Sequence, residues 1–128
     1  MFNHTCTIYN KYQDAGMDKW HKTVLSGVFW KDIKGAVIQK QGTGNQSALR
    51  LIIPKSISNA ADYVEPDNYS GSGWTLKAGD IVVFGTVSDV IISSASKELA
   101  KYSTMRIILA VDNYGFASDM ANWEVTGK

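Results

Sequence analysis

The feature that most constrains the fold is a set of short runs in which β-branched or aromatic residues recur at every second position. These runs lie at residues 5–9, 24–30, 49–53, 81–84 and 105–111. Successive side chains of a strand point to opposite faces, so this alternation is typical of strands that bury one face. Only the stretch SSASKELAKYS, residues 93–103, favours a helix, and it is long enough for about two or three turns.

Turn signals separate these runs. The segment QGTGNQS, residues 41–47, lies between extended runs at 36–40 and 49–53 and predicts a hairpin. Pro54 is expected to end the second of these strands, because proline cannot donate to a ladder. The run at residues 20–30 indicates one long strand or two strands broken near Gly27. Residues 11–18 form a polar segment, and residues 74–76 can form a short strand.

Residues 55–73 lack a clear period and are rich in serine, asparagine, aspartate and glycine. A segment of that length without periodicity is long for a compact domain. We therefore expect an all-β fold, a small barrel or sandwich of about six to eight short strands, with one short helix and a long inserted loop at about 55–73. The 128 residues are expected to form a single β-barrel-like domain over residues 1–128.

Composition narrows the classes of protein. The formal net charge is +1, which gives no strong electrostatic footprint for nucleic acid. Cys6 is the only cysteine, so no intrachain disulfide can form, and a lone thiol fits a reducing compartment. No apolar stretch approaches the roughly 18 residues of a membrane-spanning helix, and we expect no secretion signal and no membrane partner.

Few side chains in the sequence are candidates for catalysis or metal binding. Asp80 follows Gly79 in the stretch WTLKAGDIVVFG, and we interpret it as a turn residue, because aspartate bonds nearby backbone N–H groups and glycine tolerates positive φ. His4, His21 and Cys6 lack the spacing of a zinc site. A Cys6 nucleophile activated by His4 is a weaker reading than a structural thiol. We therefore predict no catalytic site, no cofactor and no metal.

Several segments together resemble the small β-barrel head–tail connector proteins of tailed phages, also called adaptor, stopper or head-completion proteins. They are HTCTIYN, GVFW at 27–30, LKAGDIVVFG, and MRIILAVDNYG followed by NWEVTGK. The chain is most similar to small structural proteins from the head–tail regions of phages and prophages of Gram-positive bacteria. The resemblance covers most of the chain as an order of elements, but the segment 55–73 and the stretch near 94–102 depart from it.

The resemblance implies a non-enzymatic virion protein at the head–tail interface. Such a protein forms a ring with copies of itself, docks on neighbouring head or tail proteins, and resides in the host cytoplasm during assembly. Nucleic acid would at most pass through a channel. In this setting the segment 55–73 would reach a neighbouring subunit, since it lacks the apolar surface to fold alone. The expected interface residues are Tyr63, Val64, Tyr69 and Trp74.

Two other functions remain open at this point. A small β-barrel could bind nucleic acid by stacking bases on aromatic side chains. The candidates for that platform are Trp20, Phe29, Trp30, Trp74, Phe84 and Trp123. A small enzyme using Asp80 or Asp112 with a histidine is the third hypothesis. Trp74 and Trp123 are expected to be at least half buried, in the core or in an interface, because aromatics supply much of the burial in small β domains.

Overall fold

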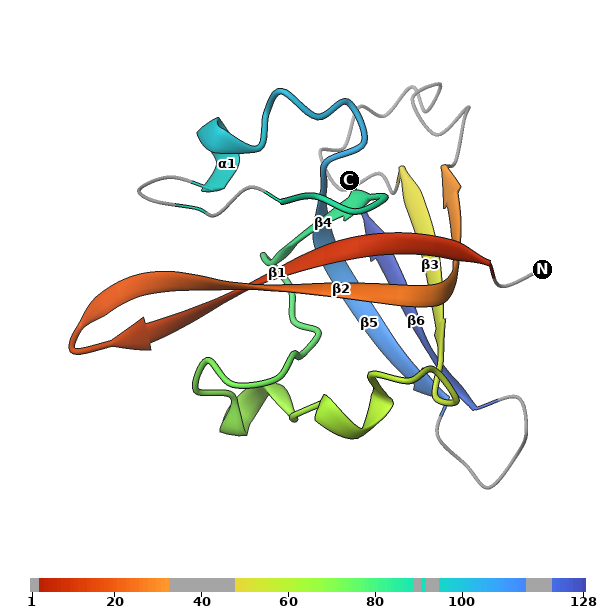
Figure 1. The fold of residues 1–128 in the computed structure, drawn as a ribbon, viewed down its shortest axis with the longest axis horizontal. Coiled ribbons are helices and arrows are strands. Elements are labelled where there is room, and N and C mark those ends of the chain that lie inside the picture. The colour runs from red at the N-terminus through yellow and green to blue at the C-terminus, as the bar shows by residue number, and fades with distance from the viewer. Residues whose placement is uncertain (1–2, 33–47, 89–90, 92–94, 115–120) are drawn as a thin grey trace, which may run out of the picture.

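The computed structural model describes residues 3–32, 48–88, 91, 95–114 and 121–128, and within them six antiparallel strands close into a barrel (Figure 1). The order around the barrel is β1-β2-β3-β6-β5-β4. The prediction of a small all-β fold, a barrel or a sandwich, is confirmed, and the structure is a barrel. The strands are β1 (His4–Asp14), β2 (Met17–Asp32), β3 (Leu49–Pro54), β4 (Ile81–Phe84), β5 (Arg106–Tyr114) and β6 (Asn122–Gly127).

The barrel interior is filled by apolar side chains from every one of these strands. Small barrels have interiors just wide enough to be filled in this way. A channel for nucleic acid would therefore have to lie between copies of the chain. The buried cluster comprises Cys6, Ile8, Leu25, Val28, Trp30, Leu49, Leu51, Ile53, Trp74, Leu76, Val82, Ile108, Trp123 and Val125.

β1 and β2 form a hairpin that is longer than the sequence indicates. Asp14 pairs with Met17 across Ala15 and Gly16, whose φ angles are 54° and 79°. Two central residues with positive φ make a type I′ turn, which matches the twist of the flanking strands. The polar segment expected here is polar, but it consists of paired strand ends and a tight turn. These residues read as polar because both faces of this part of the hairpin meet water.

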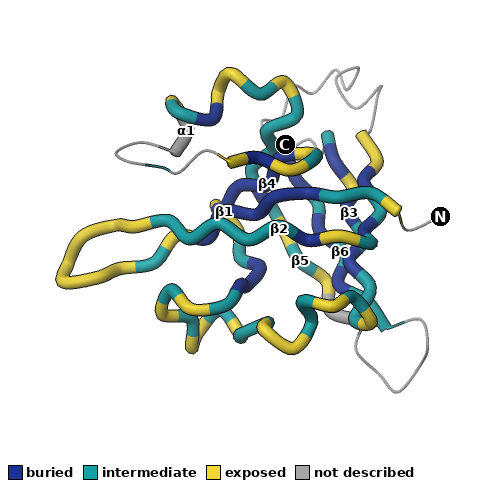
Figure 2. The backbone as a smooth tube through the Cα atoms, viewed as in Figure 1, coloured by how far each residue is buried: buried dark blue, intermediate teal, exposed yellow. Residues whose placement is uncertain are grey.

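We call residues 11–20 the arm. β1 pairs with β4 only over residues 6–9, and β2 pairs with β3 only over residues 29–32. The arm therefore extends beyond the barrel wall as a two-stranded ribbon (Figure 1). Its tip is exposed to solvent (Figure 2). The strand through Gly27 is continuous, and this glycine (φ 87°) lies where the β1–β2 register shifts opposite His4 and Thr5.

A second apolar cluster lies on the outer face of β1 and β4. Thr7 and Tyr9 of β1 are buried as fully as Cys6 and Ile8 on the other face, so this part of β1 is covered on both sides. The connection between β4 and β5 supplies the cover (Figure 2). The second cluster comprises Tyr9, Ile81, Val83, Val87 and Leu99, with Trp20, Ile91, Tyr102, Met105 and Ile107 packed against it.

The helix is shorter than expected. α1 (Ala95–Glu98) is a single turn, after which the chain continues as turns rather than as helix. Leu99 is fully buried, and its carbonyl accepts a bond from Tyr102 N at 3.1 Å. This turn brings Tyr102 and Met105 onto the second cluster, a position that a continued helix would not give. The predicted strand at 36–40, the QGTGNQS turn and the first serines of the helical stretch lie outside the described residues.

The segment 55–73 is folded onto the barrel. It contains two 3₁₀ turns, η2 (Ala60–Asp62) and η3 (Pro66–Asn68). The Tyr63 ring lies 5.0 Å from that of Trp74 and 4.5 Å from that of Trp123. The segment is thus ordered on its own barrel, which supplies the apolar surface that the segment lacks alone. A contact between this segment and a neighbouring subunit stays a prediction. Residues 74–76 form no strand; the pairing is one isolated parallel bridge between Tyr63 and Trp74.

Candidate docking cleft beside strand β2

One edge of β2 is not paired in the described part of the chain. β1 pairs with one side of β2 from Met17 to Val28, whereas β3 pairs with the other side only at residues 29–32. The two-residue turn makes Asp14 and Met17 a hydrogen-bonded pair, and such pairs alternate along an antiparallel ladder. The N–H and C=O groups that point away from β1 therefore belong to Asp18, Trp20, Lys22 and Val24. We call this the β2 edge.

A cleft of about 640 Å³ runs between part of this edge and the segment 55–73. Residues 21–24 of β2 form one wall. Asn59, Asp62, Val64 and Gly73 belong to the other wall. Backbone hydrogen-bonding groups, a few polar side chains and two valines thus meet in one hollow. Those are the requirements for binding an extended peptide at a sheet edge.

The wall opposite β2 is held rigidly. Val64 N donates to Trp74 O at 2.8 Å, and Trp74 N donates to Asp62 O at 3.2 Å. The indole Nε1 of Trp74 donates to Asn59 O at 2.8 Å. Gly73 has a φ of 76°, and a Cβ there would overlap the carbonyl oxygen of Asp62. Only glycine fits this position without a shift of the backbone.

The four residues expected to form an interface have different environments. Trp74 is 0% exposed and belongs to the core, and it is also among the residues that line the cleft. Its role in an interface stays a prediction. Trp74 and Trp123 are both buried, as predicted for these two side chains. Tyr63 is half-buried between their rings, and burial raises the pKa of its phenol. Val64 lines the cleft, and its role as a contact residue stays a prediction.

Tyr69 connects the segment 55–73 to the arm. Its ring meets that of Tyr12 edge-to-face at 6.3 Å, and its hydroxyl donates to Gly73 O at 3.1 Å. Burial, followed by the nearby charge of Asp80 and the neighbouring Tyr12, raises the pKa of the Tyr69 phenol to about 12. Tyr69 therefore braces the arm as well as the cleft wall. Its role as a contact residue for another protein stays a prediction.

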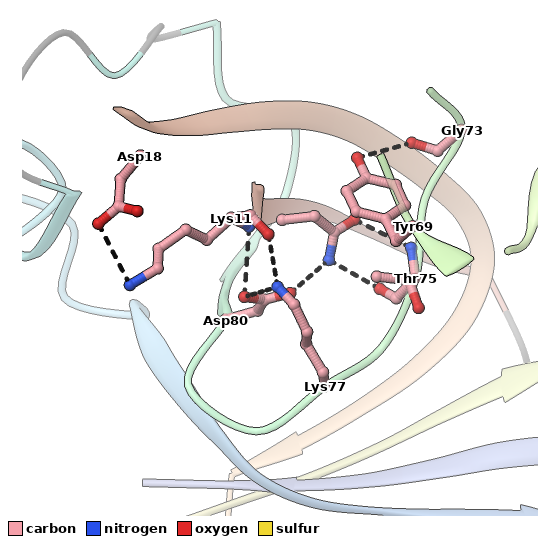
Figure 3. A network of polar contacts seen from close by, with 8 residues as sticks. Lys11, Asp18, Tyr69, Gly73, Thr75, Lys77 and Asp80 are labelled. Carbon is pink, nitrogen blue, oxygen red and sulfur yellow. Dashed lines mark hydrogen bonds and ion pairs between the residues drawn. The ribbon is translucent and has the colours of Figure 1, made fainter. Parts of the chain in front are cut away.

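Asp80 lies in a buried polar network that fastens the turn 77–80 to β1 (Figure 3). The turn is closed by Asp80 N donating to Lys77 O at 3.2 Å, with Gly79 at a φ of 95°. The carboxylate accepts bonds from Lys11 N at 3.3 Å and from Lys77 Nζ at 3.1 Å. Burial raises the pKa of Asp80, and its hydrogen bonds and the Lys77 charge act in the opposite direction.

Asn10 completes this network, and the sequence gives no signal for it. Its Nδ2 donates to Thr75 O and to Asp80 Oδ2, both at 2.8 Å. Its Oδ1 accepts a bond from Thr75 N at 3.0 Å. The amide side chain thus pairs with both backbone groups of Thr75, as a neighbouring strand would. Asp80 is a turn residue whose carboxylate also caps the free side of β1.

Of the other groups considered for chemistry, His21 belongs to the β2 wall of the cleft, whereas Cys6, His4 and Asp112 are not among the residues that line it. Cys6 is fully buried, and burial raises the pKa of its thiol to about 12. His4 Nδ1 accepts a bond from Trp30 N at 3.0 Å, and its ring stacks on Phe29. Asp112 is an exposed residue of β5 and pairs across the sheet with Glu124.

Two features are absent from the described residues. No group of three or more histidine, cysteine, aspartate and glutamate side chains there could hold a metal ion. No helix in that part of the chain is long and apolar enough to cross a membrane.

The chain is a small closed β-barrel that carries a projecting hairpin arm and a cleft beside β2. Residues 1–128 match the family described as "Family of unknown function (DUF6751)", and the chain belongs to that family. No curated protein and no solved structure matches the chain.

Proposed function

We propose that this chain is a non-enzymatic structural protein of a phage or prophage that acts at the head–tail interface. In this proposal copies of the chain assemble into a ring and dock on neighbouring virion proteins, first in the host cytoplasm and then in the virion. The sequence resemblance to head–tail connectors is the starting point. The observation that carries the proposal is the arm. It projects from a barrel whose interior is filled by side chains, and its tip is exposed to solvent.

An arm of this kind suits assembly better than catalysis. Met17 at its tip is 66% exposed, and an exposed large apolar side chain at the end of an ordered ribbon is typical of a contact with another chain. The barrel keeps each copy folded before that contact forms, because its core is complete without a partner.

A second surface for neighbouring proteins lies at one end of the barrel. Phe84 is 41% exposed, and its ring meets those of His4 and Trp30 at 5.6 and 5.5 Å. Aromatic side chains that are already held by neighbouring rings lose little entropy on binding, and such residues are enriched at interfaces. This aromatic patch and the arm are the two surfaces that we assign to docking.

The test is complementation in the phage or prophage that encodes the chain. The gene is deleted and supplied in trans as wild type or as a short-arm variant in which residues 13–18 are replaced by Asn-Gly. This replacement keeps the hydrogen-bonded pair Tyr12–Lys19 next to a two-residue turn, so the barrel should fold. The matched control is Ala15→Asn, which introduces the same Asn-Gly turn into a full-length arm.

Wild type and Ala15→Asn should restore infectious particles, and the short-arm variant should yield heads and tails that do not join. Mass spectrometry of purified particles should find the protein in the virion. Its absence from particles, or full titre with the short arm and an unchanged melting temperature, would contradict the proposal. Tight binding to single-stranded oligonucleotides at physiological salt, without particle association, would instead favour the nucleic-acid alternative.

A further inference from the structure

The two edges of the arm differ, and the difference determines how strand pairing between copies can occur. On the β1 side, Lys11 N donates to Asp80 Oδ1 and Lys11 O accepts a bond from Lys77 Nζ at 2.5 Å. The outward-pointing backbone groups of Lys11 are therefore already hydrogen-bonded, and we call this side capped. Between this cap and the turn, only Gln13 has outward-pointing backbone groups. No described residue caps the β2 edge in this way along Asp18, Trp20, Lys22 and Val24. Open strand edges of this length are usually blunted or covered, because they pair with other chains.

We propose that the β2 edge pairs with the β2 edge of a second copy in antiparallel orientation, giving a two-fold symmetric dimer centred on Trp20. Since the β1 side is capped, a head-to-tail pairing of β2 with β1 has too few free backbone groups. Pairing of β2 with β2 uses the same edge twice, which is the definition of an isologous contact.

Charge selects the register. With Trp20 opposite the partner copy's Trp20, each Asp18 lies opposite a Lys22, so the dimer gains two cross-strand pairs of opposite charge. A shift that centres the axis on Lys22 places two lysines opposite each other, and a shift that centres it on Lys19 does the same. The intermediate register, centred on His21, forms no ion pair. Asp18 and Lys11 are about half exposed and 3.6 Å apart, so their existing pair is weak.

In this register the turn end of the second copy's arm lies at the cleft. Thr23 then lies opposite Met17 of the second copy, and Val24 lies opposite Gly16 of the second copy. The turn end of each arm thus enters the cleft of the other copy, whose volume of about 640 Å³ accommodates it. In this dimer the exposed side chain of Met17 is covered by the cleft that Val24 and Val64 of the other copy line. The pairing closes with two copies, so the inference stands whether or not the proposed ring function holds.

The first test is charge reversal on the full chain, measured by sedimentation equilibrium at low salt. Wild type should show a monomer–dimer equilibrium. Asp18→Lys and Lys22→Asp should each weaken the dimer about tenfold or more, because each turns two attractive pairs into repulsive ones. The double variant should recover most of the wild-type affinity. Asp67→Lys, an exposed charge reversal in η3, is the matched control and should change little.

The second test is cross-linking under mild oxidation. Directly opposed hydrogen-bonded residues have Cα atoms about 5.5 Å apart, which is within disulfide range. A mixture of Asp18→Cys and Lys22→Cys chains should therefore form a heterodisulfide, and neither variant alone should cross-link efficiently. Cys6 is buried and should not contribute. A wild type that stays monomeric to about 1 mM, or a dimer that tolerates both single reversals, would overturn the proposal.

Discussion

Asn10→Ala is the substitution whose effect follows most directly from the structure. The Asn10 amide makes three buried hydrogen bonds, two with the backbone of Thr75 and one with the Asp80 carboxylate. Alanine removes all three and leaves their partners buried between β1 and the turn 77–80. The variant therefore loses the fastening between these two parts of the chain without changing an apolar contact of the barrel.

The magnitude can be estimated bond by bond. A neutral buried hydrogen bond contributes about 1 kcal/mol net, and one to a charged group contributes about 1.5–3 kcal/mol. Two neutral bonds and one charged bond give a loss of about 3–5 kcal/mol in the free energy of unfolding. Urea unfolding followed by tryptophan fluorescence measures this loss as a shift of the midpoint at constant slope.

The pH dependence provides an independent check. The pKa of Asp80 in the folded chain is above its unfolded value, so its contribution to stability is present below the unfolded pKa and is lost as pH rises through the folded pKa. The Asn10 bond lowers the Asp80 pKa, so its removal raises that pKa further. The loss in Asn10→Ala should therefore be larger at pH 7 than at pH 4. A loss below about 1 kcal/mol, or one that does not change with pH, would refute the reasoning.

Three further predictions concern single residues. Trp74→Ala should lower the free energy of unfolding by about 3–5 kcal/mol in urea titrations, since the side chain is fully buried. Gly73→Ala should lower the melting temperature more than Gly79→Ala does, because both have positive φ but only Gly73 faces a blocking carbonyl; equal effects would contradict this. The Cys6 thiol should resist alkylation until the chain unfolds, and rapid labelling of the native protein would argue against its burial.

Tyr69 supplies a prediction at high pH. Its phenol has a pKa of about 12 in the folded chain against the ordinary value of 10.0, so its contribution to stability is lost as pH rises from the unfolded value through the folded one. In Tyr69→Phe the fall in stability over that range should be smaller. Ultraviolet difference spectra of the two proteins measure the titration directly, and an ordinary phenol titration in wild type would contradict the prediction.

Alternation in the sequence was sufficient to predict an all-β fold, but it did not decide between a barrel and a sandwich. The run at 81–84 becomes β4, the run at 49–53 becomes most of β3, and β3 ends at Pro54 as expected. The arm was missed because alternation carries information only where one face is buried. Residues 11–18 are mostly exposed, and the turn signal there, Ala15-Gly16, is weaker than Asn-Gly.

The cleft was predictable only in part. Val64 was expected to be a contact residue and does line the cleft, but the opposite wall comes from residues 21–24, some forty positions away in sequence. The pairing of residues 17–28 of β2 with β1 alone is a property of the whole topology, and no local pattern encodes it. The burial of Trp74 was predicted, but a large aromatic beside a loop has the same sequence appearance in a core as in an interface, so the sequence could not choose between them.

The closure of the barrel has a consequence for the order of folding. The β1–β2 hairpin joins residues that are near neighbours in the chain, whereas the β1–β4 seam joins residues 6–9 to residues 81–84. Local contacts form quickly, and contacts of large sequence separation form late. During synthesis the hairpin can therefore form while β4 is still inside the ribosome, leaving the seam side of β1 temporarily unpaired. Until β4 arrives, that side is the region of the nascent chain most exposed to mispairing with other chains.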